Sequence, residues 1–427
     1  MPHASIAIVG SGIAGNSAAW ALARHLDVTQ YEAEGRFGGH ACTLDIDIAG
    51  KPTPVDAGFI VYNTLNYPNL IRLFETLGVE TQPTDMSFGV SLADGTLEYR
   101  SEGRASALLA QKRNLLRPGF WRMGRDILRF YRAGPTLDQR FDLEATTLRA
   151  LLAQLGVSQS FIDWHIVPMT AAIWSAPFAQ ALDFPAATFV QFFRNHGLFS
   201  LGARPPWRTV TGGSRRYVAA LHAATPAERL PGSAVTRVIR HADGVEIQAH
   251  GQPPRRFDQV VLACHADQAL ALIDAPGPAE QQVLGAFRTA PNLAVVHADV
   301  QAMPHKRSAW ASWNYVTGSS PQPDAPAPVT YWMNSLQGLD PRQDVFVSLN
   351  PQIAIAPDKV FQTLEFRHPV FDLAAIRAQR RLETIQGADR LWFCGAWTRY
   401  GFHEDGCASG LAIAGMLAAR AGAQAAA

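Results

Sequence analysis

The sequence IAIVGSGIAG, residues 6–15, is a short apolar run that breaks into a Gly10-x-Gly12-x-x-Gly15 pattern. Such a pattern predicts a buried strand that turns sharply into a helix near Ile13. Gly10 permits the tight turn, Gly12 lets the backbone approach a pyrophosphate, and Gly15 lets the helix pack closely on the sheet. The unpaired N–H groups at the start of the helix attract phosphates. The stretch therefore predicts a site for a dinucleotide cofactor.

An acidic residue and a second glycine pair narrow the choice of cofactor. Glu32 follows the run DVTQY (27–31), where a carboxylate accepts hydrogen bonds from ribose hydroxyls and disfavours a 2'-phosphate. The segment GRFGG (35–39) then supplies more bare backbone and a cation, Arg36, whose planar guanidinium suits phosphate. Because FAD lies extended along such a crevice, this pattern favours FAD over a nicotinamide cofactor. The alternative for Arg36 is a solvated surface turn.

The C-terminal part of the chain contains a third glycine-rich segment. Residues 391–410, LWFCGAWTRYGFHEDGCASG, predict a strand that ends at Gly395, a polar loop, and a helix that starts near Gly406 with Asp405 as its N-cap. The start of that helix would direct N–H groups into the crevice, where they stabilise the negative charge of a reduced flavin. The alternative is a C-terminal helix that only packs on the sheet. The helix can also have both roles.

These segments resemble the flavin amine oxidase superfamily, which includes monoamine oxidases, protoporphyrinogen oxidase and phytoene desaturases. The middle of the chain extends the resemblance, in TGGS (211–214), AVTRV (234–238) and FDQVVLAC (257–264). The resemblance implies an α/β fold with two domains: a Rossmann-like FAD-binding domain of the glutathione-reductase type and an interleaved α+β substrate domain. It also implies FAD as the cofactor.

A narrower resemblance rests on GGHACTL (38–44), VDAGFIVYN (55–63) and FCGAWTRYGFHEDG (393–406). These segments are similar to a bacterial subgroup described as predicted NAD/FAD-binding proteins. Members of the subgroup accompany cyclopropane-fatty-acid-synthase-like methyltransferases, and some resemble desaturases of methylated acyl chains. One position departs from the superfamily, which usually has Gly-Gly-Arg where this chain has Gly-Gly-His40. Arg36 is therefore the expected phosphate cation.

The residues expected to contact FAD come from five segments of the chain. In the superfamily, the backbone at the position that matches Val238 contacts the adenine. A covalent thioether from Cys394 or Cys407 to the flavin is an alternative to the expected non-covalent binding. The full expected set is Gly10, Ser11, Gly12, Ile13, Ala14, Gly15, Glu32, Ala33, Arg36, Gly38, Gly39, His40, Gly58, Phe59, Ile60, Val238, Gly395, Ala396, Asp405, Gly406 and Cys407.

The order of these segments predicts two interleaved domains. The FAD-binding domain is expected to take residues 1–100, 209–275 and 386–427. The substrate-binding domain is expected to take residues 101–208 and 276–385.

Three side chains are candidates for the base that a desaturation needs after hydride removal. Tyr62, His403 and Glu404 lie in the segments that the superfamily places beside the isoalloxazine. Each has an alternative role: Tyr62 as a core aromatic residue, His403 and Glu404 as helix caps or supports. No lysine lies in a context like the active-site lysine of many amine oxidases, since Lys306 and Lys359 fall in predicted loops.

An aromatic-rich stretch favours a long apolar substrate, although many of its side chains must belong to the core. The expected reaction is dehydrogenation of a lipid acyl chain, such as a methylated fatty acyl group, by hydride transfer to flavin N5. The alternatives are an amine oxidase acting on a small amine, and a non-catalytic lipid-escort protein of the same fold. The aromatic residues are Phe161, Trp164, Trp174, Phe178, Phe184, Phe189, Phe192, Phe193 and Phe199.

The segment Lys112–Arg132 has the most uneven charge pattern of the chain. It contains seven basic residues against a single acid, Asp126, with Phe120 and Trp121 among them. A basic amphipathic helix of this kind is typical of an anionic membrane interface. The alternative is a solvated basic face whose apolar side packs inward.

Composition sets the remaining bounds. The 427 residues carry a net charge of +1, which argues against nucleic acid as a partner. The four cysteines show no CxxC spacing, so we expect no bound metal. We also expect the protein to reside in a reducing compartment. No apolar stretch reaches transmembrane length. We expect a cytoplasmic protein, peripheral on the inner face of the membrane, with a hydrophobic small-molecule or lipid substrate and a methyltransferase as pathway partner.

Overall fold

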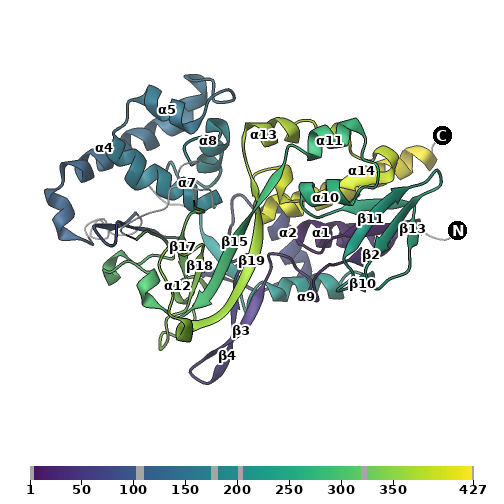
Figure 1. Ribbon diagram of the computed structural model, residues 1–427, viewed down its shortest axis with the longest axis horizontal. Helices are drawn as coiled ribbons and strands as arrows, with labels where there is room; N and C mark the ends of the chain where they lie inside the picture. Colours follow the sequence, from purple (N-terminus) through teal and green to yellow (C-terminus); the bar gives the residue numbers. More distant parts are fainter. Residues whose placement is uncertain (1–3, 102–109, 175–180, 201–204, 319–324, 426–427) are drawn as a thin grey trace.

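The computed structural model describes residues 4–101, 110–174, 181–200, 205–318 and 325–425 (Figure 1). It is a mixed α/β structure, which confirms the expected fold class. Within these residues, no helix is both long enough and apolar enough to cross a membrane.

A five-stranded parallel sheet, in the order β10-β2-β1-β14-β20, collects strands from distant parts of the chain. Strand β1 and the turn after it come from the opening glycine-rich stretch, as the sequence predicts. The strands are β1 (Ser5–Val9), β2 (Asp27–Tyr31), β10 (Glu228–Leu230), β14 (Gln259–Leu262) and β20 (Leu391–Phe393).

Both faces of the parallel sheet are covered. Helices α1 (Ile13–Leu22) and α14 (His403–Ala425) pack together on one face, in purple and yellow in Figure 1. Their approach is close: a Cβ on Gly410 of α14 would lie 2.2 Å from the carbonyl oxygen of Ala14. The other face packs against α10 (Ala266–Leu272) and a small antiparallel sheet of β11 (Val235–Arg240), β12 (Val245–Ala249) and β13 (Arg255–Phe257).

A seven-stranded sheet, in the order β19-β15-β18-β17-β16-β7-β8, forms the second large layer. Its first two strands in sequence lie within residues 1–100, which we placed in the cofactor domain. Strand β7 pairs with β8 and with β16, so residues 88–100 belong to this second sheet, and the division into domains stays a prediction. The strands are β7 (Phe88–Leu92), β8 (Leu97–Arg100), β15 (Arg288–His297), β16 (Trp313–Val316), β17 (Val329–Trp332), β18 (Phe346–Leu349) and β19 (Val360–Val370).

Helices of the first insertion pack on this sheet around an aromatic core. The Phe130 ring lies 5.5 Å from that of Phe161 and 5.7 Å from that of Phe199, between centroids. Phe178, expected in the same group, lies outside the described residues. The helices are η1 (Lys112–Leu116), α4 (Pro118–Ala133), α5 (Leu148–Leu155), α6 (Gln159–Phe161), α7 (Val167–Trp174) and α8 (Ala186–Asn195).

Shorter elements connect these layers. A small sheet contains β5, β6 and β9, and the hairpin β3–β4 projects from the body of the molecule (Figure 1). The elements are β3 (Thr43–Ile48), β4 (Lys51–Asp56), β5 (Tyr62–Asn63), α2 (Pro68–Leu77), β6 (Thr81–Thr84), β9 (Trp207–Val210), α9 (Arg215–Ala223), α11 (Pro278–Leu284), α12 (Met333–Gln337) and α13 (Leu373–Gln379).

The buried carboxylate of Asp56 ties several of these elements together. It accepts hydrogen bonds from the Thr43 hydroxyl at 2.6 Å, from the Ser214 N–H at 2.9 Å and from the Gln337 amide at 3.1 Å. Burial raises the pKa of Asp56 to about 6. The network joins the β3–β4 hairpin, the start of α9 and the end of α12.

We expect Asp56→Ala to lower the free energy of unfolding by about 2–4 kcal/mol, because it leaves buried donors on Thr43, Ser214 and Gln337 without an acceptor. Urea denaturation followed by circular dichroism measures the change. The matched control is Asp45→Ala on the same hairpin, which removes an exposed ion pair with Arg215 and should cost less than about 1 kcal/mol. Equal losses in the two variants would contradict a structural role for the network.

Candidate cofactor and active site

The carboxyl ends of the parallel strands form one edge of the sheet. Val9 is level with Tyr31 on one side and with Leu262 on the other, and Leu262 is level with Phe393. The chain turns away directly after each of these residues. Ligands of open parallel sheets bind at this edge, so the glycine-rich turn after β1 stands where a cofactor is expected.

The three glycines of the first turn do different things in the structure. Gly10 has φ +105°, and a Cβ there would lie 2.8 Å from the carbonyl oxygen of Ala263. A Cβ on Gly15 would lie 2.1 Å from the carbonyl oxygen of Gly10, so the helix can pack only without one. A Cβ placed on Gly12 would have no heavy atom within 4 Å. The turn therefore leaves open space at the one glycine assigned to the pyrophosphate.

The other glycine-rich segments converge on this turn. A Cβ on Gly39 would lie 3.1 Å from Cα of Gly12, and one on Gly406 would lie 2.7 Å from Cγ2 of Ile13. The same position on Gly406 lies 3.7 Å from the Ala396 nitrogen. Segments around residues 10–15, 38–40 and 395–406 therefore form one cradle of bare backbone.

Residues 58–60 join the cradle through His40. The Phe59 N–H donates to the His40 carbonyl oxygen at 2.7 Å, and a Cβ on Gly58 would lie 2.2 Å from the same oxygen. Ile60 is buried behind them and accepts a hydrogen bond from the Thr209 hydroxyl. The expected contacts Gly58 and Phe59 thus lie next to the second glycine pair.

Glu32 stands at the edge of the sheet, where ribose hydroxyls are expected. One carboxylate oxygen accepts the Ser11 N–H at 3.0 Å and the Ser11 hydroxyl, and the other accepts the Glu34 N–H at 2.9 Å. The Ser11 hydroxyl in turn accepts the Gly38 N–H at 3.1 Å. Ser11 therefore links the first turn, Glu32 and the second glycine pair, whereas Ala33 beside them is exposed.

Arg36 and His40, which we expect beside the pyrophosphate, lie at the second glycine pair. The Arg36 guanidinium donates to the Gly39 carbonyl at 2.8 Å and pairs with Glu34. His40 stacks on Phe366, with ring centroids 4.9 Å apart. Its Nε2 is buried without a hydrogen-bond partner among the described residues. A buried ring nitrogen without a partner next to the second glycine pair fits a polar group of FAD.

The start of α14 differs from the expectation. The helix begins at His403, three residues before the expected Gly406, so Asp405 lies in the first turn and is not the N-cap. Its carboxylate reaches back to the Phe402 N–H at 2.9 Å, and burial raises its pKa to about 7. The N–H groups without intrahelical partners are those of the first turn, because the Gly406 N–H already bonds to the Phe402 carbonyl.

Cys407 and Val238 make contacts within the protein. Cys407 faces α1, where the Ser17 hydroxyl lies 3.4 Å from its sulfur, and burial raises the thiol pKa to about 12. Such a thiol is inert, which argues against a thioether to flavin. The carbonyl oxygen of Val238 is taken by the Asp274 N–H at 3.0 Å. The Ser233 N–H bonds to the Glu32 carbonyl at 2.8 Å, and the expected adenine contact at Val238 stays a prediction.

The first candidate base, His403, lies at the cradle against residues 58–60. His403 stacks on Phe59 with ring centroids 3.8 Å apart, and its Nε2 lies 2.6 Å from the Tyr217 hydroxyl. Burial lowers the pKa of His403 to about 3 and raises that of Tyr217. Both groups are therefore neutral in the hydrogen bond that they share. The sequence contains no local signal for Tyr217, since only the packing of α9 brings it here.

The other two candidates have structural partners. Both carboxylate oxygens of Glu404 accept hydrogen bonds from the start of α2, from Asn69 and from the Leu70 N–H. The Tyr62 hydroxyl lies 3.2 Å from that of Thr81, and its ring packs against Tyr67 and Phe74. Glu404 and Tyr62 are therefore poor candidates for the base.

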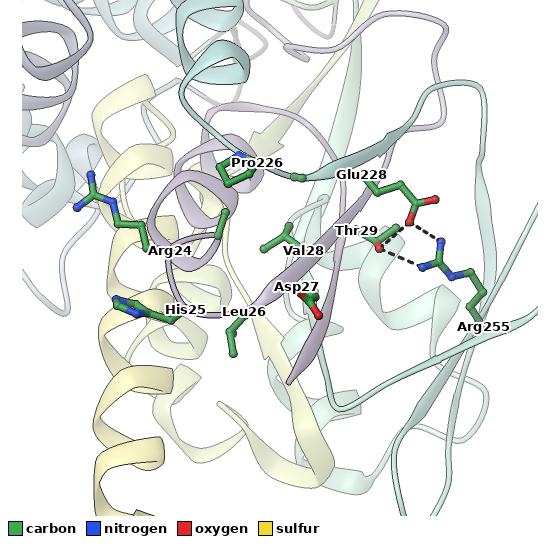
Figure 2. A pocket seen from close by; sticks show the side chains of 11 residues that line it. Arg24, His25, Leu26, Asp27, Val28, Thr29, Pro226, Glu228 and Arg255 are labelled. Atoms are coloured by element: carbon green, nitrogen blue, oxygen red, sulfur yellow. Dashed lines mark hydrogen bonds and ion pairs between the residues drawn. The ribbon is translucent and has the colours of Figure 1, made fainter. Parts of the chain in front are cut away.

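A surface hollow of about 430 Å³ lies elsewhere (Figure 2). It is lined by the loop before β2 and the start of β2, together with Glu228 and Arg255, which form an ion pair beside Thr29. Because this is the amino end of the strand that Glu32 follows, the hollow is not part of the cradle.

The glycine cradle, the acid after β2 and the parallel sheet define a dinucleotide-binding oxidoreductase of the flavoprotein type. The profile of the flavin containing amine oxidoreductase family matches residues 13–338. The chain belongs to this family and is an FAD-dependent oxidoreductase. Membership and the intact cradle argue against the escort alternative. No curated protein sequence matches the chain.

Solved structures of similar fold cover nearly the whole chain. A putrescine oxidase variant superposes with a TM-score of 0.70 at 16% identity, covering 98% of this chain and 99% of its own. A fatty acid isomerase from P. acnes that produces CLA superposes with a TM-score of 0.66 at 16% identity, covering 95% of this chain and 97% of its own. Cyclohexylamine oxidase from Brevibacterium oxydans IH-35A superposes with a TM-score of 0.67 at 15% identity, covering 97% of this chain and 100% of its own. Identities this low establish the fold alone.

We expect Gly12→Ala to weaken FAD binding by roughly 5- to 150-fold, since the added methyl group would occupy cofactor space at a cost of about 1–3 kcal/mol. The apo-protein should keep its free energy of unfolding within about 0.5 kcal/mol, because φ at Gly12 is −63° and the space is open. Flavin titration and urea denaturation of the apo-protein measure the two effects.

Two further glycines serve as controls for this prediction. Gly15→Ala should destabilise the apo-protein itself, because its Cβ would overlap the Gly10 carbonyl. Gly415→Ala lies at an exposed position of α14 with open space around it. It should lower neither the affinity for FAD nor the free energy of unfolding. Normal FAD affinity in Gly12→Ala would show that the cofactor does not approach this turn.

Proposed function

We propose that the enzyme dehydrogenates a lipid acyl chain, such as a methylated fatty acyl group, and that a methyltransferase supplies its substrate. When bound, FAD accepts the hydride at N5. The chain's own residues would exclude water, hold the acyl carbon near the cradle and take up the second proton. The observation that carries this proposal is a row of aromatic side chains that leads from the cradle into the insertion.

The row begins directly before α14. The Phe402 ring stacks on Phe192 at 5.1 Å, and Phe192 contacts His196 at 3.9 Å and Trp174 at 4.9 Å, between centroids. Phe192 and Trp174 belong to the aromatic core of the insertion. An acyl chain gains roughly 0.8 kcal/mol for each buried methylene, so a site with such walls needs few polar anchors. The fold similarity to a fatty acid isomerase is consistent with a substrate of this kind.

The charges around the cradle support the same choice. Burial lowers the pKa of His196 to about 4 and that of His403 to about 3, so both rings are neutral at pH 7. The carboxylate of Glu404 is engaged by α2, and Lys359 is paired with Asp299 at 3.1 Å. A protonated amine needs a free carboxylate or an aromatic cage before it can be desolvated.

An amine substrate remains the second candidate, on one observation. The nearly parallel stack of Phe59 and His403, with Asp405 in the same turn of α14, places an aromatic pair and an acid at the start of that helix. The pKa of Asp405, raised by burial to about 7, leaves that acid only partly ionised at neutral pH. The family and the fold similarity to putrescine oxidase are compatible with this reading.

We expect methylated or unsaturated phospholipid acyl chains to bleach the flavin of the purified enzyme in anaerobic mixing, and primary amines and polyamines to leave it oxidised. The visible absorbance of the flavin is the readout. Bleaching by an amine, with every lipid inert, would reverse the order of the two candidates.

His403→Asn should slow anaerobic reduction of the flavin by roughly 10²- to 10⁴-fold, because it removes the imidazole that would accept the proton. Flavin content should stay that of the wild type. The matched control is Tyr62→Phe, which loses only the bond to Thr81 and should stay within about twofold of the wild-type rate. Rates that respond to Tyr62 and not to His403 would assign the base to the tyrosine.

A further inference from the structure

Exposed apolar side chains gather at the outer end of the first insertion. Eight large hydrophobic side chains are exposed among the described residues, and four of them lie between residues 115 and 128. Figure 1 places α4, which carries two of the four, at the end of the molecule away from both termini. We call this group the apolar ridge: Leu115 (40% exposed), Leu116 (86%), Trp121 (58%) and Leu128 (44%).

The ridge exists in addition to the face that α4 packs inward. Phe120, Met123 and Phe130 of the helix are buried in the core, so this side of α4 packs inward, as the alternative for the segment states. Trp121 faces outward, and its indole N–H donates to the Leu115 carbonyl at 2.9 Å. That bond fixes α4 against η1 and holds the indole ring at the surface.

Cations surround the ridge. Segment 112–132 has seven basic residues and one acidic residue, a net charge of +6, whereas the whole chain has +1. The single acid, Asp126, is fully buried. Among the described residues, only Arg125 of the seven forms an ion pair, with that acid. The other cations on the exposed face of α4, Arg122, Arg129 and Arg132, have no acidic partner there.

A basic hollow of about 600 Å³ lies beside η1 and extends this surface. Lys112 and Arg113 line it from the first insertion, and His305 and Lys306 line it from the second. Its one acid, Glu98, is buried and already accepts the N–H groups of His305 and Lys306. The hollow therefore presents lysine side chains from two segments, next to exposed leucines.

We propose that this face docks on an anionic phospholipid surface. The apolar ridge would enter the interface between headgroups and acyl chains, while the arginines and the basic hollow would meet the phosphates. Nucleic acid would match the charge and leave the leucines in water, so a lipid surface is the partner that satisfies both kinds of side chain. The docking does not depend on which substrate the enzyme oxidises.

Sedimentation of the full-length FAD-loaded protein with vesicles tests the proposal. Vesicles of phosphatidylcholine containing about 30% phosphatidylglycerol should bind it roughly tenfold more tightly than phosphatidylcholine alone. Binding should weaken between about 0.1 M and about 1 M salt, because screening shortens the range of the charges. Absence of binding, or binding that ignores lipid charge and salt, would overturn the proposal.

Paired variants locate the contact. Leu116→Ser with Leu128→Ser, and separately Arg122→Glu with Arg129→Glu, should each weaken binding to the anionic vesicles roughly tenfold. All four side chains are exposed, so flavin content should not change. The controls are Leu65→Ser, exposed elsewhere, and Arg72→Glu with Arg377→Glu, which should bind as the wild type does. Equal losses in the variants and the controls would place the contact elsewhere.

Insertion of the ridge has a direct readout. A polarity-sensitive dye on Leu116→Cys should report an apolar environment when anionic vesicles are added, whereas the same dye on Leu65→Cys should not. The four native thiols are buried or half-buried, so the introduced cysteine is the exposed target. A dye at position 116 that stays in water while the protein sediments with vesicles would overturn the assignment of the ridge.

Discussion

The rest of the structure depends on the close approach of backbone segments at the start of α1. The Gly10 carbonyl packs against Gly15, Ile13 packs against Gly406, and Gly12 lies beside Gly39. Each approach is possible because the glycine has no side chain. These contacts join parts of the chain that the parallel sheet brings to one edge. Parallel strands need long crossover connections, and here the insertions that form the second large sheet and the aromatic core occupy those connections.

Three buried histidines that stay uncharged shape the electrostatics of the cradle. His40, His368 and His403 are neutral because burial lowers the pKa of each, and the histidines around them add to the effect at His40. Arg36 is then the cation nearest to the second glycine pair, and it donates to that pair's own backbone. Where relatives usually place an arginine, this chain offers a neutral ring with one unsatisfied nitrogen. A neutral ring adds no charge for a phosphate, so Arg36 stays the expected phosphate cation.

Local patterns predicted the parts of the site that depend on local geometry. The first turn, Glu32 and the second glycine pair lie together at the edge of the sheet, since backbone conformation and spacing along the chain bring them there, and their contacts with FAD stay a prediction. The role of Tyr217 and the capture of Glu404 by α2 depend on how distant helices pack, and no spacing in the sequence reports that. The bond from the Asp274 N–H to the Val238 carbonyl oxygen is another contact that depends on packing, and the expected adenine contact at Val238 stays a prediction.

The same distinction explains α4. Its sequence alternates aromatic and basic residues, and periodicity alone does not say which aromatic side chain faces the core. Packing places Phe130 against Phe161 and Phe199 and leaves Trp121 outside, held by a bond to the backbone of η1. One helix therefore forms both a wall of the aromatic core and the outermost basic surface of the insertion. A change in the packing of its inner face would displace the arginines and Trp121 with it, so the core fixes the geometry of that surface.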